Sequence, residues 1–153
     1  MALGNEALLD WNDHMVPVAS VISFVRKVKK AISQPVTVAD NYNWWALHGT
    51  GLAKELDFVS FQTYPVWEGK NIDEAMSFPI ANLQAVRNAL PQSRFVITES
   101  GWAPVASEFG PRANEAKQKS RPGPGAAGEV TIASFPDNGS TNHFRIYRVI
   151  ELP

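Results

Sequence analysis

The chain has 153 residues, of which 44% are hydrophobic and 19% charged, so it fits one globular domain and not a disordered protein. Its 14 Lys and Arg against 15 Asp and Glu give a net charge of -1, which argues against binding to nucleic acid or to an anionic membrane. The absence of cysteine excludes disulfides, thiolate metal sites and a cysteine nucleophile.

No stretch of the sequence has the character of a membrane anchor or an export signal. No apolar run approaches the roughly 20 residues that span a bilayer. The first residues also lack a basic segment followed by an apolar one. We therefore expect a soluble chain without a signal peptide or a membrane span, and its compartment stays open.

Residues 1–102 alternate between helical and strand-like hydrophobic patterns. Short β-branched runs predict strands, whereas apolar residues at three- and four-residue steps predict helices, the last of them bent by Pro79. In chain order these elements cover 1–5, 18–32, 36–39, 45–56, 57–64, 72–90 and 94–98. The βαβαβαβ order predicts an α/β fold with a parallel sheet and right-handed crossovers.

The rest of the chain has a different character. From Ser120 the sequence is rich in glycine and proline and predicts a linker, followed by β-like pieces at 130–132 and 144–150. We therefore divide the chain into a domain at 1–119 and an irregular tail at 120–153. A frame shift or a gene junction near Ser120 would explain the abrupt change.

Polar and aromatic residues follow every predicted strand of the first region. In parallel α/β sheets, ligands bind beyond the carboxyl ends of the strands, so these residues are the candidates for a site. They are Asn5 and Glu6, the run from Asp40 to Trp45, the run from Gln62 to Glu68, and the run from Glu99 to Trp102. Paired carboxylates with aromatic rings around them suit cleavage of a glycosidic bond, although aromatic residues near strand ends also cover cores.

Three segments carry a family resemblance. The segments 3–6, 57–69 and 97–102, which read LGNE, DFVSFQTYPVWEG and ITESGW, resemble in order and spacing the second half of the family 17 β-1,3-glucanase-like glycoside hydrolases. The resemblance implies a (β/α)8 TIM barrel, of which this chain would hold a partial, half barrel with strands four to seven. It implies no cofactor, and the spacing of the three histidines predicts no metal site.

The resemblance also assigns roles to individual residues. It implies Glu6 as the general acid/base and Glu99 as the nucleophile of a retaining mechanism, with Tyr64 beside Glu99. The candidate substrate-binding residues are Asn5, Tyr64, Trp67, Glu68, Trp102, Asp40 and Trp44.

Structural interpretations of the same residues stay open. Glu6 and Glu99 could be carboxylates paired for stability, and Asp40 and Glu68 could be solvated loop residues. Of the adjacent Trp44 and Trp45, one is expected to pack inward and the other to face the cleft.

A half barrel would leave an apolar inner face and two unpaired strand edges. We therefore expect a homodimer that completes an eight-stranded, barrel-like assembly. The expected partner molecule is a β-1,3-glucan-type oligosaccharide or polysaccharide. The alternatives to hydrolysis are a carbohydrate-binding fragment without turnover and a purely structural half barrel.

Overall fold

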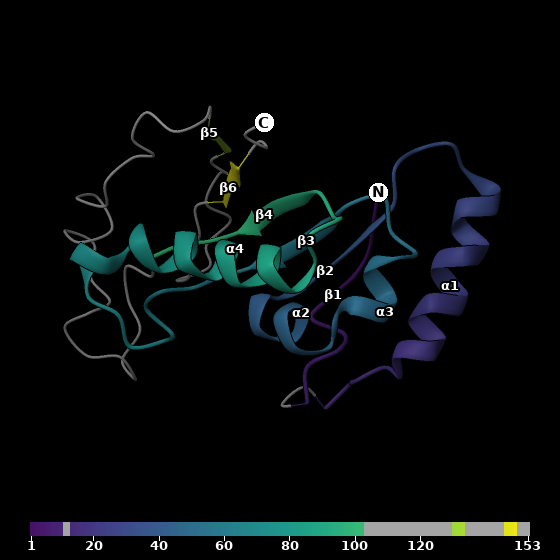
Figure 1. Cartoon of the computed structure of the whole chain (residues 1–153), viewed down its shortest axis with the longest axis horizontal. Helices are drawn as coiled ribbons and strands as arrows, with labels where there is room; N and C mark the ends of the chain where they lie inside the picture. Colours follow the sequence, from purple (N-terminus) through teal and green to yellow (C-terminus); the bar gives the residue numbers. More distant parts are fainter. Residues whose placement is uncertain (11–12, 103–129, 134–145, 150–153) are drawn as a thin grey trace, which may run out of the picture. The chain divides into compact units, whose positions relative to one another are not determined.

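The computed structural model describes residues 1–10, 13–102, 130–133 and 146–149 (Figure 1). Its elements are β1 (Ala2–Asn5), α1 (Val18–Ala31), β2 (Thr37–Asn41), α2 (Tyr42–His48), α3 (Thr50–Ala53), β3 (Val59–Gln62), the 3₁₀ helix η1 (Ile72–Glu74), α4 (Ser77–Ala89), β4 (Phe95–Glu99), β5 (Val130–Ala133) and β6 (Ile146–Val149). Strands β1 to β4 form one sheet in chain order, and β1–β2 and β2–β3 pair in parallel. The predicted α/β fold with a parallel sheet is confirmed.

The chain divides into two compact units. The first comprises residues 1–62 and 83–96, and the second comprises residues 63–82 and 97–153. Strand β4 begins in the first unit and ends in the second.

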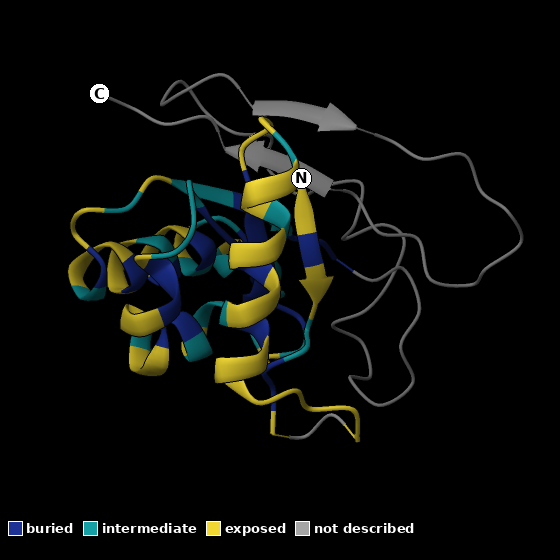
Figure 2. Ribbon diagram, turned by 90° about the vertical axis from the view of Figure 1, so that its right-hand side faces the viewer, coloured by how far each residue is buried: buried dark blue, intermediate teal, exposed yellow. Residues whose placement is uncertain are grey.

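The core of the first unit lies around β2 and β3. The side chains of Val36, Val38, Val59 and Phe61 are all fully buried, as expected for central strands of a parallel sheet covered on both faces. In β1, by contrast, only Leu3 is buried, and the strand appears mostly exposed in Figure 2. β1 is therefore an edge strand in character as well as in sheet order.

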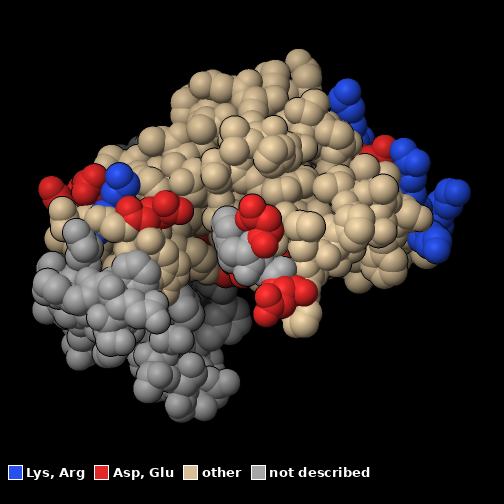
Figure 3. Space-filling model, turned by 90° about the horizontal axis from the view of Figure 1, so that it is seen from below, with Lys and Arg blue, Asp and Glu red and all other residues tan. Residues whose placement is uncertain are grey.

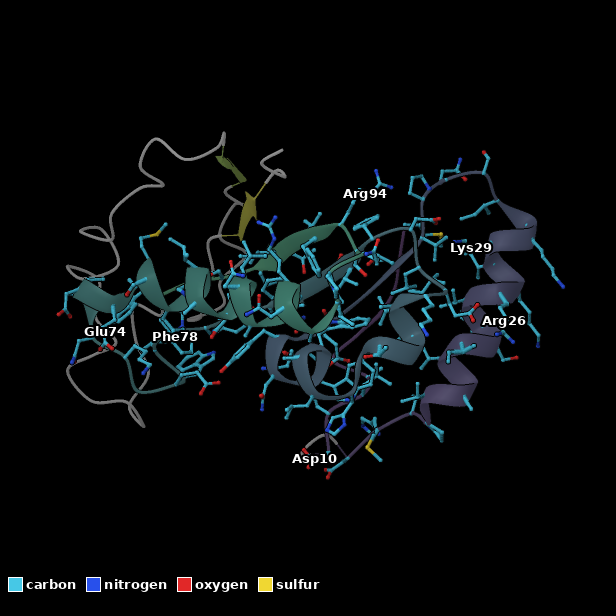
Figure 4. The ribbon with its side chains drawn as sticks, viewed as in Figure 1. Asp10, Arg26, Lys29, Glu74, Phe78 and Arg94 are labelled. Carbon is cyan, nitrogen blue, oxygen red and sulfur yellow. The ribbon has the colours of Figure 1, made fainter. Side chains whose placement is uncertain are left out.

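Helix α1 packs one apolar stripe inward and carries a basic face. Val21 and Val25, four residues apart, are its buried side chains. Figure 3 shows Lys and Arg side chains gathered on the side of α1. Arg26 and Lys29 bind Glu55 and Asp57 at 2.7 Å each, which ties α1 to the segment between α3 and β3 (Figure 4).

The helix predicted over 45–56 is divided in the structure, and its start was predicted too late. α2 begins at Tyr42, where the side chain of Asn41 accepts a hydrogen bond from the backbone N–H of Asn43 at 2.8 Å and caps the helix. The division falls at Gly49, where a Cβ would lie 2.5 Å from the ring of Trp45. Glycine at this position therefore allows the backbone to approach the buried tryptophan.

The helix predicted over 72–90 is likewise two elements, and the bend predicted at Pro79 was wrong. Asn71 and Glu74 form a capping box that starts the short helix η1, and α4 then begins at Ser77. Pro79 lies in the first turn of α4, where its missing N–H would have no helical partner. It therefore marks the start of a helix.

The two β-like pieces predicted in the tail are strands. β5 and β6 pair antiparallel, with Val130 opposite Val149 and Ala133 opposite Ile146. The predicted linker at 120–128 lies outside the described residues, and the boundary at residue 119 stays a prediction.

Candidate active site

Glu6 follows β1 in a backbone conformation that side chains rarely adopt. Its φ is +50°, and Gly4 before it has a φ of +84° at an irregularity in the pairing of β1 with β2. The N–H of Glu6 donates to the carbonyl of Ala39 at 3.0 Å, which holds this turn against β2. A non-glycine residue in the left-handed region costs about 1–3 kcal/mol, and such residues cluster at functional sites.

Asn5 and Gln62 connect two strand ends within the first unit. The side-chain amide of Gln62 donates to the side-chain oxygen of Asn5 in a short hydrogen bond. Gln62 is buried, whereas Asn5 is exposed. Asn5 thus presents an amide whose orientation is set by Gln62, a residue that the sequence reasoning placed at a strand end without giving it a role.

Asp40 is fully buried, so its interpretation as a solvated loop carboxylate was wrong. Its two oxygens accept hydrogen bonds from the backbone N–H of Leu8 at 3.0 Å and from that of Asn41 at 2.9 Å. Burial raises the pKa of Asp40, while backbone hydrogen bonds from Asn41, Leu8 and Ala7 oppose the shift. The observed contacts of Asp40 fasten the loop that follows β1.

Trp44 and Trp45 divide as the sequence predicted with respect to packing. Trp45 is fully buried, whereas Trp44 is half-buried and meets it edge-on, with ring centroids 5.1 Å apart and an interplanar angle of 85°. The indole N–H of Trp45 has no hydrogen-bond partner within the described part of the chain. Whether Trp44 contacts substrate stays a prediction.

In the second unit, Tyr64 and Glu99 form a direct side-chain pair. The phenol of Tyr64 donates a short hydrogen bond to Oε2 of Glu99. The neighbouring backbone reinforces it, because the N–H of Thr63 donates to the carbonyl of Glu99 at 3.0 Å. Asn82, on α4, donates to the hydroxyl of Thr63 at 2.8 Å and fixes the same segment.

The sequence reasoning missed Asn82. Its only signal is a buried polar residue among the apolar residues of α4, a feature that becomes informative only when its partner is known.

The remaining candidates of the second unit differ in exposure. Trp102 is buried with Val66 and Ala75, and Trp67 packs half-buried against this cluster. The Trp67 ring lies 6.5 Å from that of Tyr64 at an angle of 43°. Glu68 is exposed. The structure therefore gives Trp102 a packing role and places Trp67 beside the Tyr64–Glu99 pair.

The two units thus each hold part of the predicted site. Asn5, Glu6, Asp40 and Trp44 belong to the first unit, and the Tyr64–Glu99 pair belongs to the second. The proposed meeting of Glu6 with Glu99 stays a prediction.

The described residues contain neither a metal-binding cluster nor a membrane-spanning helix. No group of three or more His, Asp or Glu side chains there could hold a metal ion. In the same residues, no helix combines the length and apolar character that a bilayer crossing requires.

Comparisons with known proteins give one family and one fold. A family model, the BtgE/BtgC glycoside hydrolase domain, matches residues 1–145. No curated protein matches the chain significantly in sequence.

Two solved structures from Rhizomucor miehei are similar. A glycoside hydrolase family 17 β-1,3-glucanosyltransferase matches with a TM-score of 0.66 and 25% identity, over 76% of this chain and 43% of that one. An active-site mutant of a β-1,3-glucanosyltransferase in complex with laminaritriose matches with a TM-score of 0.57 and 25% identity, over 65% of this chain and 36% of that one. The predicted likeness to family 17 and to part of a TIM barrel is confirmed.

A third structure supports the fold alone. The β-glucuronidase of Bacteroides uniformis matches with a TM-score of 0.53 and 19% identity, over 76% of this chain and 16% of that one. The chain thus spans less than half of each of the three structures that it matches.

Proposed function

Because the chain belongs to the BtgE/BtgC glycoside hydrolase domain family, we propose that it supplies the catalytic carboxylates of an enzyme that cleaves β-1,3-linked glucan with retention of configuration. In this proposal Glu99 is the nucleophile and Glu6 the general acid/base. The hydrogen bond from Tyr64 to Glu99 is the observation that carries it.

The proposed reaction has the two steps of a retaining mechanism. Glu99 attacks the anomeric carbon while Glu6 protonates the departing glycosidic oxygen, which leaves a glycosyl ester on Glu99. Glu6, now a carboxylate, removes a proton from water, and the water displaces Glu99. This exchange requires the two carboxyl groups to lie about 5–5.5 Å apart.

The contacts of each residue support its proposed role. The phenol of Tyr64 donates a hydrogen bond to Oε2 of Glu99 and thereby fixes the orientation of the carboxylate. Glu6 is held in the left-handed region at the end of a strand, and strain of this kind supports assignment to a functional site. Asn5, oriented by Gln62, is the proposed ligand for a sugar hydroxyl.

Hydrolysis of laminari-oligosaccharides tests this function. We expect laminaritetraose to be cleaved by the full chain, and we expect Glu99→Gln to lower the rate about 10³-fold or more. Glu99→Gln preserves the size of the side chain and serves as a folded control when its thermal melt matches that of the unsubstituted protein. Equal rates for the two proteins would contradict the proposal.

Transfer to a sugar is the second candidate reaction. Two of the similar structures are named β-1,3-glucanosyltransferases, which supports a sugar hydroxyl in place of water as the acceptor. Products longer than the starting oligosaccharide would favour transfer, whereas only shorter products would favour hydrolysis.

A homodimer is the proposed assembly if the chain acts alone. β1 and β4 are the outer strands of the sheet, and β1 is largely exposed. A second copy could pair its β4 with this edge and cover it. Measurement of the mass in solution at micromolar concentration tests the dimer, and a monomer would contradict it.

Sugar binding without turnover would favour the alternative of an inactive binding fragment.

A further inference from the structure

The first unit contains a cleft that none of the proposed catalytic residues lines. Its volume is about 540 Å³, and it lies between the loop after β1 and helix α2. Besides Leu8 and Leu9, the residues that line it are Asp10, Met15, Asn43, Trp44, Leu47 and His48. Figure 4 shows Asp10 on the loop that follows β1.

The wall formed by α2 is a consequence of helical spacing. Trp44, Leu47 and His48 are three and four residues apart and therefore share one face of the helix. The rings of Trp44 and His48 lie 6.3 Å apart, and Trp45 supports Trp44 edge-on from the core. The aromatic wall is thus held in place before any ligand arrives.

The opposite wall is also fixed. Leu8 and Leu9 are each only 3% exposed, and the N–H of Leu8 donates to the buried carboxylate of Asp40. The N–H of Val16 donates to the carbonyl of Ala7 at 2.7 Å and closes the base of the loop. The cleft is therefore bounded by anchored backbone on one side and by a packed helix on the other.

The chemistry of the lining suits a pyranose chain. An indole ring and neighbouring aliphatic side chains can contact the C–H face of a sugar, while Asp10, Asn43 and His48 can bind its hydroxyl groups. Met15 and Leu47, which line the cleft, are 55% and 67% exposed and are therefore accessible to a ligand. The volume falls within the range of about 300–1,000 Å³ that is typical of ligand sites.

We propose that this cleft binds glucan through residues other than Glu6 and Glu99, so that a polysaccharide contacts the chain at the cleft as well as at the proposed catalytic residues. The identity of the sugar rests on the proposed function. The cleft would raise affinity for long chains, because a polymer bound at one site is present at high local concentration for the other.

Nuclear magnetic resonance tests the proposal on the full chain. In the Glu99→Gln protein, whose turnover is expected to be slower by about 10³-fold or more, titration with laminaritetraose is expected to shift the indole N–H signal of Trp44 and the ring signals of His48. Signals that stay in place at saturating sugar would overturn the inference. The test needs no substitution in the cleft, so it does not depend on whether such a variant folds.

Affinity for insoluble β-1,3-glucan gives the quantitative test. Trp44→Ala is expected to weaken binding about tenfold, the effect of losing one aromatic contact of about 1.4 kcal/mol. Trp44→Phe, which keeps a ring, should lose less. Phe24→Ala is the matched control, because Phe24 is an exposed aromatic residue on α1, 58% exposed and outside the lining of the cleft.

The outcomes separate this inference from the proposed function. Glucan binding that depends on Trp44 in a protein without turnover would support the cleft and contradict the enzyme. Turnover with unchanged glucan affinity in Trp44→Ala would support the enzyme and overturn the cleft. Saturation of the cleft by an apolar peptide, with no response to laminaritetraose, would also overturn it.

Discussion

The two proposed catalytic carboxylates are held by different means. Glu6 is placed by its backbone, through a left-handed conformation at the end of an exposed edge strand and an N–H bond to Ala39. Glu99 accepts a hydrogen bond at its side chain from Tyr64 and another at its backbone carbonyl from the N–H of Thr63. Changes in the loop after β1 should therefore act mainly on Glu6, and removal of the Tyr64 hydroxyl should act mainly on Glu99.

Replacing Glu6 with glycine should lower activity strongly and change stability little. We expect a loss of about 10²–10⁴-fold in activity, the contribution of a general acid/base. The free energy of unfolding should change by less than about 1 kcal/mol, because relief of the left-handed strain offsets the backbone entropy that glycine adds to the unfolded chain. Denaturant melts and laminaritetraose hydrolysis measure the two quantities. Glu6→Gln, which keeps the strain, is the control, and a destabilised glycine variant would contradict the account.

Tyr64→Phe should lower turnover, because it removes the side-chain hydrogen bond to Glu99. Loss of a hydrogen bond to a charged group costs about 1.5–3 kcal/mol, or roughly a 10- to 150-fold loss in turnover. The backbone bond from Thr63 to Glu99 remains, so the fold should be preserved. Tyr42→Phe is the control, because Tyr42 lies at the start of α2 in the other unit. Equal turnover in the two variants would show that Tyr64 does not position Glu99.

Asp40→Ala should loosen the loop that follows Glu6. The buried N–H of Leu8 would lose its acceptor, which costs about 1–3 kcal/mol of stability. Hydrogen exchange should accelerate in residues 7–10 before it accelerates in β3. Exchange that is unchanged in the loop would contradict the anchoring role of Asp40.

Asp40 should also make stability depend on pH. Because burial raises its pKa above the ordinary value of 3.8, the folded chain binds more protons than the unfolded chain between the two pKa values. Its contribution to stability is therefore full below 3.8 and falls as the pH rises through the raised pKa. Asp40→Asn should remove this part of the slope in a series of thermal melts, and an unchanged slope would contradict the assignment.

Arg26→Ala should have the smallest effect on stability and should leave Glu6 and Glu99 unaffected. Arg26 is a surface residue whose guanidinium lowers the pKa of Glu55, mainly by a hydrogen bond. The small stabilisation from this pair is present above the ordinary pKa of a glutamate and is lost as the pH falls. A thermal melt near pH 7 should shift less than that of Asp40→Ala. A larger shift would mean that the α1 contact matters more than the loop anchor.

The fold could be predicted from the sequence wherever one local signal was sufficient. β2 and β3 are apolar or β-branched runs, and the structure places them within two residues of the predicted bounds. The breaks at Gly49 and before Pro79 were missed, because they depend on the approach of Trp45 and on the position of a proline within its helix.

The site was less accessible to sequence reasoning than the fold. The residues at strand ends could be named, since parallel strands direct their carboxyl ends to one edge. The burial of Asp40 could not be predicted, because it depends on the loop after β1, in which Leu8 donates its N–H to the Asp40 carboxylate. Asn82 was hidden for the same reason, since its partner Thr63 lies 19 residues earlier in the chain.

Trapping of the covalent intermediate would identify the nucleophile. A 2-deoxy-2-fluoro laminaribiosyl fluoride should react with the full chain and leave a glycosyl ester that peptide mass spectrometry locates. We predict that the label lies on Glu99 and that Glu99→Gln carries no label. Turnover of laminaritetraose with the label on Glu6, or with release of the inverted anomer first, would contradict it.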